Sequence, residues 1–201
     1  MTAEPAGRVA GIVLAAGSSI RMGRNKLLLT LKGESVVRRA ARRAVAVLDP
    51  VIVVLGHEAE QVGQELVGLP CRTIVNPAHD SGIHSSVQAG IAALPADAEA
   101  AVVLLADMPL VTSAMITRMV ETFRTSGAPL VISEYGDAVA PPHLYGRTLF
   151  PELAESGGCG RDLIRRHRAQ AAVLSWPAPA LTDLDVPADL ELVEALLAEE
   201  P

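Results

Sequence analysis

The chain has 201 residues, half of them hydrophobic and only 2% aromatic, and its formal net charge at pH 7 is −6. Binding of single-stranded nucleic acid relies on aromatic side chains that stack on bases, and binding of a duplex relies on a basic face. This composition therefore argues against a nucleic-acid partner. The length suits one domain with a sizeable core, which we expect over residues 1–201.

Neither the cysteines nor the apolar runs indicate secretion or membrane insertion. Cys71 and Cys159 are far apart and form neither a CxxC nor a zinc pattern. The N-terminal stretch MTAEPAGRVAG has no apolar signal-peptide core, and the longest wholly apolar run, 100–106, is too short to span a bilayer. We therefore expect a cytoplasmic protein with no membrane partner.

Short apolar runs alternate with helical patterns along the first half of the chain. Residues 9–14 and 51–55 are nearly all apolar, as strands covered on both faces are. Between them, residues 34–48 carry apolar side chains at helical spacing. The other face of this helix carries four arginines, and we expect it to be solvated: Arg38, Arg39, Arg42 and Arg43.

The remaining elements are predicted in the same way from periodicity and from turn residues. Up to residue 133 we expect a helix over 58–66, a strand over 72–75, a helix ending near Leu94, a strand over 100–105, a helix from Thr112 or Ser113 to about Thr125, and a strand over 130–133. Beyond it we expect Pro-rich and Gly-rich loops over 137–145 and 156–160, a helix over 161–167, a strand over 172–175 and a loop over 176–180. The chain closes with the short apolar-flanked segment 184–186 and a helix opened by Pro187.

This order of elements predicts an α/β fold with a single doubly wound, Rossmann-like sheet. Right-handed crossovers give the mostly parallel sheet a core order of 3-2-1-4. Ligands of such sheets bind at the carboxyl ends of the strands, where the strand order reverses. The two segments that leave the sheet there are the loop after residue 14 and the segment that begins with Asp107.

The loop after the first predicted strand has the features of a polyphosphate site. Gly17 and Gly23 allow the backbone to turn and to approach an anion closely, because they lack a Cβ. Exposed N–H groups in such a turn attract anions, and Arg21 and Lys26 add positive charge. The spacing matches neither the Walker A motif nor the dinucleotide fingerprint.

The string LAAGSSIRMGRNK at residues 14–26 resembles the LAAGxSxRMGxxK signature of the MobA-like nucleotidyltransferases. It is most similar to the molybdenum cofactor cytidylyltransferases. The resemblance implies a fold of the GT-A-like type and transfer of CMP from CTP to a molybdopterin-type phosphate, with release of pyrophosphate. It also implies catalytic roles for Arg21 and Lys26. The nucleotide contacts that it implies in this loop are Leu14, Ala15, Ala16, Gly17, Ser18, Ser19, Arg21 and Lys26.

The preference for CTP is implied by the second alanine of this string. LAAG is typical of the family members that use CTP, whereas the guanylyltransferases tend to have LAGG. A Cβ at Ala16 narrows the pocket beside the base, which favours a pyrimidine over a purine.

Two further segments resemble the metal-binding elements of the family. LLADMPLV resembles the GDxP element, so Asp107 is implied to bind Mg²⁺ and nucleotide and to be catalytic. TDLDVPADL resembles DIDTPEDL, so Asp183 or Asp185 is implied to complete the metal site. Alternatively, Asp107 begins a helix as its cap, or Asp185 caps the last helix. Asp189 lies inside that helix and is expected to be structural.

The segment NPAHDSGIHSSVQAG resembles the family pattern NPxxxxGmxsSLxxG. The resemblance places Ser85 and Ser86 at a helix start, where hydroxyl and N–H groups can meet a nucleotide. His79, Asp80 and His84 could form a metal cluster. We expect loop histidines without metal, because no third ligand stands at suitable spacing.

The second half departs from the family pattern at two places. GGCGRDLI replaces a GDxGAR-like stretch, so that Gly158 stands in place of an aspartate and the cation moves to Arg161. APPHLYGRTLFPEL resembles the GxPxLF element, but His143 is unusual there. We expect residues 9–110 to bind the nucleotide and 111–201 the acceptor, so these departures leave the acceptor open.

Two other functions remain open at this stage. The acceptor could be a sugar phosphate or another small phosphate. The chain could also be a MobA-like binding protein, or an oxidoreductase of the nicotine blue oxidoreductase type. The cations and carboxylates favour an enzyme, and the missing dinucleotide fingerprint argues against redox chemistry. A molybdoenzyme or chaperone partner is compatible with the resemblance.

Overall fold

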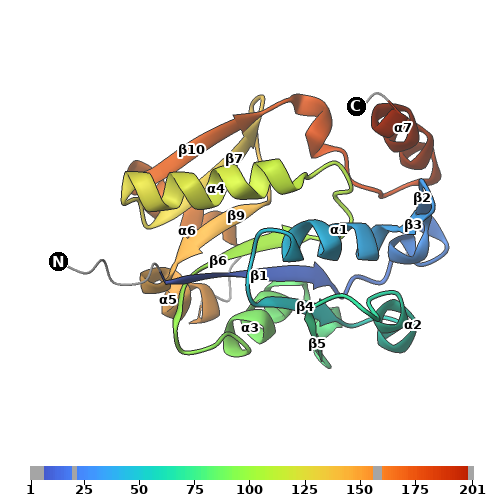
Figure 1. Cartoon of the computed structure of the whole chain (residues 1–201), viewed down its shortest axis with the longest axis horizontal. Helices are drawn as coiled ribbons and strands as arrows, with labels where there is room; N and C mark the ends of the chain where they lie inside the picture. The colour runs from blue at the N-terminus through green and yellow to red at the C-terminus, as the bar shows by residue number, and fades with distance from the viewer. Residues whose placement is uncertain (1–6, 20–21, 156–159, 199–201) are drawn as a thin grey trace.

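The computed structural model describes residues 7–19, 22–155 and 160–198, and a mostly parallel sheet lies at its centre (Figure 1). Along this sheet the strands run in the order β10-β7-β9-β6-β1-β4-β5, with β8 paired to β7. The strands are β1 (Arg8–Ala15), β4 (Val51–Leu55), β5 (Arg72–Val75), β6 (Ala98–Leu105), β7 (Leu130–Tyr135), β8 (Ala138–Val139), β9 (His143–Gly146) and β10 (Ala171–Trp176). A separate hairpin joins β2 (Thr30–Leu31) to β3 (Glu34–Ser35).

Helices cover both faces of the sheet. The α-helices are α1 (Val36–Val45), α2 (Ala59–Gln64), α3 (Ile83–Ala92), α4 (Ser113–Ser126), α5 (Phe150–Glu155), α6 (Gly160–His167) and α7 (Pro187–Ala198). Buried residues of α1, α2, α4 and α7 share one core with the sheet, and those of α5 and α6 share a second core, which α3 joins on the opposite face. Figure 1 shows α1 and α4 in front of the sheet and α3 behind it.

The predicted core order is confirmed. Strands β5, β4, β1 and β6 are neighbours in that order and run parallel, with Val13 of β1 opposite Val53 of β4 and Leu104 of β6. Every residue of β4 is buried, because helices pack on both faces. The carboxyl end of β1, at the right in Figure 1, is therefore the place where strand order reverses and a ligand is expected.

The predicted loop over 137–145 is wrong. Residues 138–139 form β8, and the chain then enters β9, which runs antiparallel between β6 and β7. All four residues of β9 are buried. Prolines at 141 and 142 mask this strand in the sequence, since they cannot donate ladder hydrogen bonds, and the pairing that stabilises β9 comes from distant residues.

The predicted solvated arginine face of α1 is also wrong. Arg39 and Arg43 are only 7% and 8% exposed, and Arg43 Nη1 donates to the carbonyl oxygens of Val111, at 2.8 Å, and of Pro109. The segment before α4 packs on α1, so the guanidinium groups satisfy carbonyls there while their apolar stems remain buried. Arg42 is the exposed one, and its Nε lies 2.8 Å from Glu34 Oε1.

The C-terminal segment returns to the carboxyl edge of the sheet. Residues 184–186 form neither a helix nor a strand. Instead Leu184 is fully buried, and its N–H donates to the carbonyl oxygen of Asp107 at 3.1 Å. Helix α7 then packs beside the β2–β3 hairpin, where Lys32 Nζ donates to the carbonyl of Leu197 (Figure 1). Within the described ranges no helix is long and apolar enough to cross a membrane.

Candidate active site

The loop after β1 forms one wall of a cavity of about 400 Å³. The wall consists of Leu14, Ala15, Ala16, Gly17 and Ser18. The cavity lies at the carboxyl edge of the sheet, at the predicted switch point, because β1 ends at Ala15. Of the other residues expected in this loop to bind nucleotide, Arg21 lies outside the described residues and Ser19 does not line the cavity.

Backbone hydrogen bonds keep this loop compact. Ser19 adopts a left-handed φ of 52°, its carbonyl accepts from the N–H of Met22 at 3.0 Å, and its hydroxyl accepts from the N–H of Lys26 at 3.2 Å. Gly23 has the expected positive φ of 68°, whereas Gly17 does not. At Gly17 no heavy atom lies within 4 Å of the position that a Cβ would occupy. Gly17 thus leaves open space beside the backbone, which allows a ligand to approach closely.

Asn25 holds Lys26 in place. Its side-chain oxygen caps the short 3-10 helix η2 (Lys26–Leu28) by accepting from the N–H of Leu27 at 3.1 Å. Its amide nitrogen donates to Glu58 Oε2 at 2.9 Å, which ties the loop to the segment after β4. Sequence reasoning missed both Asn25 and Glu58. The available signal was a capping asparagine directly before the lysine.

The Lys26 ammonium lies between two carboxylates from distant parts of the chain. Its Nζ is 2.6 Å from Asp107 Oδ2 and 2.9 Å from Asp185 Oδ1, and the lysine side chain is only 12% exposed. Burial acts to lower the pKa of Lys26, but the two carboxylates outweigh burial, so the net shift is upward. Lys26 is therefore a fixed positive charge at neutral pH.

The alternative that these aspartates only cap helices is not supported. Thr112 is the N-cap of α4, and its Oγ1 accepts from the N–H of Met115 at 3.2 Å. At the start of α7, Asp189 Oδ2 accepts from the N–H groups of Asp185 and Val186 at 2.8 and 2.7 Å. Asp189 is thus the structural residue that was expected, and the Asp185 side chain is directed to Lys26.

Asp183 lies close enough to feel the same charges. Its pKa is raised, first by burial and then by the negative charges of Asp185 and Asp107. Even so, within the described residues no group of three or more His, Cys, Asp or Glu side chains is arranged to hold a metal ion. Two carboxylates, Asp107 and Asp185, converge on one cationic atom. Such a pair suits Mg²⁺ or a similar hard cation when substrate oxygens and water complete its coordination.

The opposite wall of the cavity comes from the start of α3. Ser86 lines the cavity, whereas Ser85 closes the preceding loop by donating to the carbonyls of Ala78 and Gly82 at 2.9 and 2.8 Å. Asn76 Nδ2 donates to both hydroxyls, at 2.8 Å to Ser85 and 3.1 Å to Ser86. Of the two expected serine contacts, the structure therefore brings Ser86 to the cavity.

The loop histidines take different positions. His79 lines the cavity together with Asp80, and its Nδ1 lies 3.2 Å from Asp80 Oδ1. His84 lies on the far side, in a second cavity of about 550 Å³. The two histidines thus line different cavities. The two cavities adjoin, since Leu14, Ile83 and Leu105 line both.

Comparison with protein families decides the relationship. The model of the MobA-like NTP transferase domain matches residues 11–172. The chain belongs to the MobA-like NTP transferase family. It is therefore a nucleotidyltransferase, a class of enzymes that transfer nucleotidyl groups.

Individual relatives support this relationship along almost the whole chain. It is 31% identical over 203 residues to the purine catabolism protein PucB of Bacillus subtilis, covering 94% of this chain and 97% of PucB. It is 37% identical over 154 residues to the bifunctional protein GlmU of Mycobacterium ulcerans, but that match covers only 30% of GlmU and 71% of this chain.

Solved structures show the same fold. The crystal structure of Rv0371c from Mycobacterium tuberculosis H37Rv superimposes with a TM-score of 0.85 at 27% identity, covering 96% of this chain and all of that chain. A further structure of Rv0371c, described as a complex with manganese, has a TM-score of 0.76 at 26% identity and covers 94% of this chain and 98% of that chain.

Proposed function

We propose that this family member transfers CMP from CTP to a molybdopterin-type phosphate and releases pyrophosphate. The observation that carries the proposal is the Lys26 ammonium, held between Asp107 and Asp185 beside a cavity that the loop after β1 encloses. A fixed cation beside a glycine-containing loop suits a triphosphate, and the paired carboxylates suit the metal cation that accompanies it.

The reaction needs positioning more than proton transfer. A phosphate oxygen of the acceptor attacks the α-phosphorus of CTP, and the bond to the bridging oxygen of pyrophosphate breaks. The nucleophile is already an anion, so no strong general base is required. Lys26 offsets negative charge on the triphosphate, and Arg21 is proposed to do the same from the loop. The backbone of residues 14–18 and the Ser86 hydroxyl orient the nucleotide.

Asp107 and Asp185 are the residues proposed to hold Mg²⁺. Their carboxylate oxygens already meet at one cation, the Lys26 ammonium, so the donor set fits a hard divalent ion. Asp183, whose pKa is raised first by burial and then by these two carboxylates, lies near the pair and is the alternative ligand. When bound, the metal neutralises the phosphates. The manganese complex of Rv0371c supports the use of a divalent cation.

The proposed preference for CTP rests on Ala16. This residue is 7% exposed and lines the cavity, and its carbonyl accepts from the N–H of His57 at 3.3 Å, which holds it in place. A methyl group fixed at this position limits the space for a base. The smaller pyrimidine is therefore favoured over a purine.

The two cavities support a division of the chain into a nucleotide-binding half and an acceptor-binding half. The first is lined by residues between 14 and 107, and the second draws most of its far wall from residues 139–168. We propose that residues 9–110 bind the nucleotide and 111–201 bind the acceptor.

The test is release of pyrophosphate from each of the four NTPs with Mg²⁺ and a panel of phosphate acceptors, including a pterin monophosphate and a sugar phosphate. We expect CTP to be preferred, and Ala16→Gly to narrow the ratio of kcat/KM between CTP and GTP by about tenfold, as a small steric group does. Asp107→Asn should abolish most turnover and serves as the inactive control. Equal or better use of GTP by the unaltered protein would contradict the assignment.

A further inference from the structure

The second cavity is built for a different molecule from the first. Its walls are mostly apolar and come from α3, β6, α5 and α6, with Val87, Val103, Leu153 and Ile164 as examples. A polyhydroxylated sugar would lose hydrogen bonds to water on entering such walls without gaining partners. A flat, unsaturated ring would lose few, because its faces are apolar and its polar atoms lie at its edge.

His143 supplies a hydrogen-bond donor inside this apolar cavity. The side chain is 5% exposed, and its Nδ1 accepts from the backbone N–H of Ser133 at 3.3 Å. The proton of the neutral ring is therefore on Nε2. Burial lowers the pKa of His143 to about 4, so the ring stays neutral near pH 7. The Tyr145 ring packs edge-on against the imidazole, with the two ring centroids 6.3 Å apart, and this contact fixes the orientation of the imidazole.

His84 is a second histidine of this cavity. Its Nε2 is buried without a hydrogen-bond partner among the described residues.

Arg161 supplies a cation at the rim. Three arginines line the cavity, of which Arg165 pairs with Asp162 at 3.0 Å and Arg168 pairs with Glu134. Arg161 forms no ion pair with any residue that the structure describes. Its charge therefore remains available for an anionic group of a bound molecule.

We infer that the second cavity binds the body of the acceptor, a flat unsaturated ring system whose edge accepts a hydrogen bond from His143 and whose anionic group contacts Arg161. This inference rests on the proposed function, because the shared lining of the two cavities brings the acceptor against the nucleotide. His143 and Arg161 are thus specificity-determining residues for the acceptor. A sugar phosphate is the acceptor that this cavity disfavours.

The variants can separate recognition from folding. In His143→Asn, the side-chain oxygen takes the place of Nδ1 and still accepts from Ser133, but no donor reaches the position of Nε2. In His143→Gln, the longer side chain places its amide nitrogen, a hydrogen-bond donor, near the position that Nε2 occupies in the histidine. Arg161→Gln removes the rim charge, and Arg166→Gln is its matched control, because Arg166 lies on the same helix, pairs with Glu152 and does not line the cavity.

The first measurement is binding of a pterin monophosphate, followed by its fluorescence without nucleotide. His143→Asn and Arg161→Gln should each weaken binding about tenfold, while Arg166→Gln leaves it unchanged and His143→Gln recovers most of it. The loss in Arg161→Gln should disappear when the probe is the uncharged pterin alcohol. Unchanged binding in both His143→Asn and Arg161→Gln would overturn the inference.

The second measurement is turnover with CTP, comparing the pterin monophosphate with glucose 1-phosphate. We expect His143→Asn to raise KM for the pterin and leave KM for CTP unchanged, and preference for glucose 1-phosphate would overturn the inference. The two proposals fail separately. Pterin binding that depends on His143 without any CTP turnover refutes only the proposed function, whereas CTP turnover that is indifferent to His143 and Arg161 refutes only the acceptor site.

Discussion

At the scale of single residues, Lys26 links the parts of the candidate site. Its backbone N–H closes the loop on Ser19, and its ammonium joins Asp107, which follows β6, to Asp185, which precedes α7. Asp107 lies 81 residues after Lys26 in the sequence, and Asp185 lies 78 residues after Asp107. One side chain therefore connects three segments at the carboxyl edge of the sheet.

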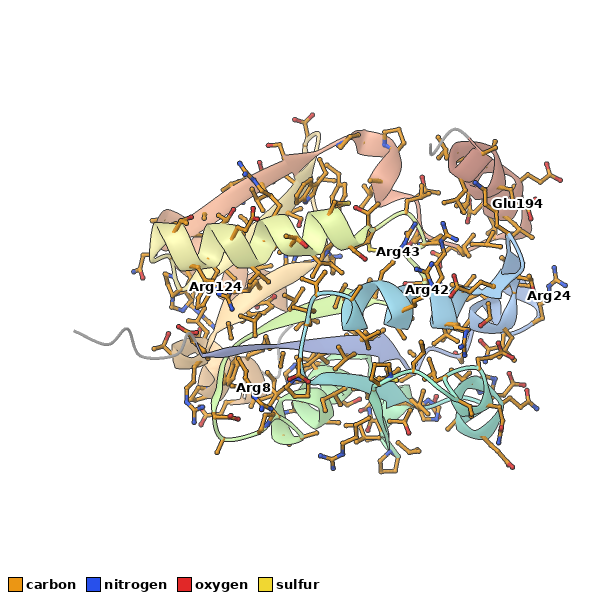
Figure 2. All side chains as sticks on the ribbon, viewed as in Figure 1. Arg8, Arg24, Arg42, Arg43, Arg124 and Glu194 are labelled. Carbon is orange, nitrogen blue, oxygen red and sulfur yellow. The ribbon has the colours of Figure 1, made fainter. Side chains whose placement is uncertain are left out.

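We expect Lys26→Ala to lower kcat/KM by a factor that corresponds to about 2–3 kcal/mol, because a charge-assisted contact to the triphosphate is lost. Arg24→Ala is the matched control. Arg24 lies in the same loop but is exposed and extends outward from the molecule in Figure 2. The measurement is steady-state pyrophosphate release, with Tm recorded for each variant. Full kcat/KM in Lys26→Ala would show that this loop is not the triphosphate site.

At the scale of elements, α1 holds the segment that follows Asp107. Arg43 donates to the carbonyls of Pro109 and Val111, and its own carbonyl accepts from the Ser113 hydroxyl at 3.0 Å. Figure 2 shows Arg43 where α1 approaches the start of α4. The helix that appeared to present arginines to solvent thus positions the strand end from which Asp107 extends.

Replacing Arg43 by methionine should reduce the free energy of unfolding by about 2–3 kcal/mol, because two buried carbonyls lose a charged donor while the apolar volume is kept. Activity should fall as well, since the Asp107 segment is released. Arg42→Met should cost under about 1 kcal/mol, because Arg42 is exposed and its pair with Glu34 is screened by solvent. Urea titration of both variants measures the difference, and equal costs would contradict this role of Arg43.

At the scale of the whole molecule, β9 joins the parallel strands β6, β1, β4 and β5 to the pair β7 and β10. It is the antiparallel strand between β6, which leads to Asp107, and β7, which pairs with β10. His143 begins this strand and is buried at the junction. Protonation of one side chain there should consequently affect the stability of the entire fold.

This burial has a defined sign in the pH dependence of stability. The pKa of His143 falls from 6.5 to about 4 on folding, so between those values the unfolded chain binds more protons and stability decreases as the pH decreases. At about 1.4 kcal/mol per pH unit, His143 contributes about 3 kcal/mol above pH 6.5, which is lost by pH 4. Denaturant titrations at a series of pH values give the free energy of unfolding of the unaltered protein and of His143→Asn. Between pH 6.5 and pH 4, the difference between the two free energies should change by this amount. Parallel curves would show that His143 does not titrate as a buried neutral ring.

The sequence by itself determined the parallel core. Strands β1, β4 and β6 could be predicted because each contains an apolar run bounded by turns, whereas β5 is a short, mostly exposed strand between turns. Their order could be predicted because handedness rules leave few ways to connect such strands. The placement of Lys26 and Asp107 at one edge followed from the same rules. Most helices were predicted within a few residues for a similar reason, namely local periodicity.

Only the tertiary structure decided what depends on partners distant in the chain. The strand β9 lies behind two prolines and is stabilised by pairing with β6 and β7. Arg39 and Arg43 are buried because the segment before α4 offers carbonyls that local sequence does not reveal. Whether Asp185 caps α7 was open in the sequence, and only the contacts decided it: Asp185 meets Lys26, whereas Asp189 accepts the N–H groups at the start of α7. In each case the deciding free energy comes from a contact between segments that are distant in the chain. Sequence periodicity reports only the contacts within one segment.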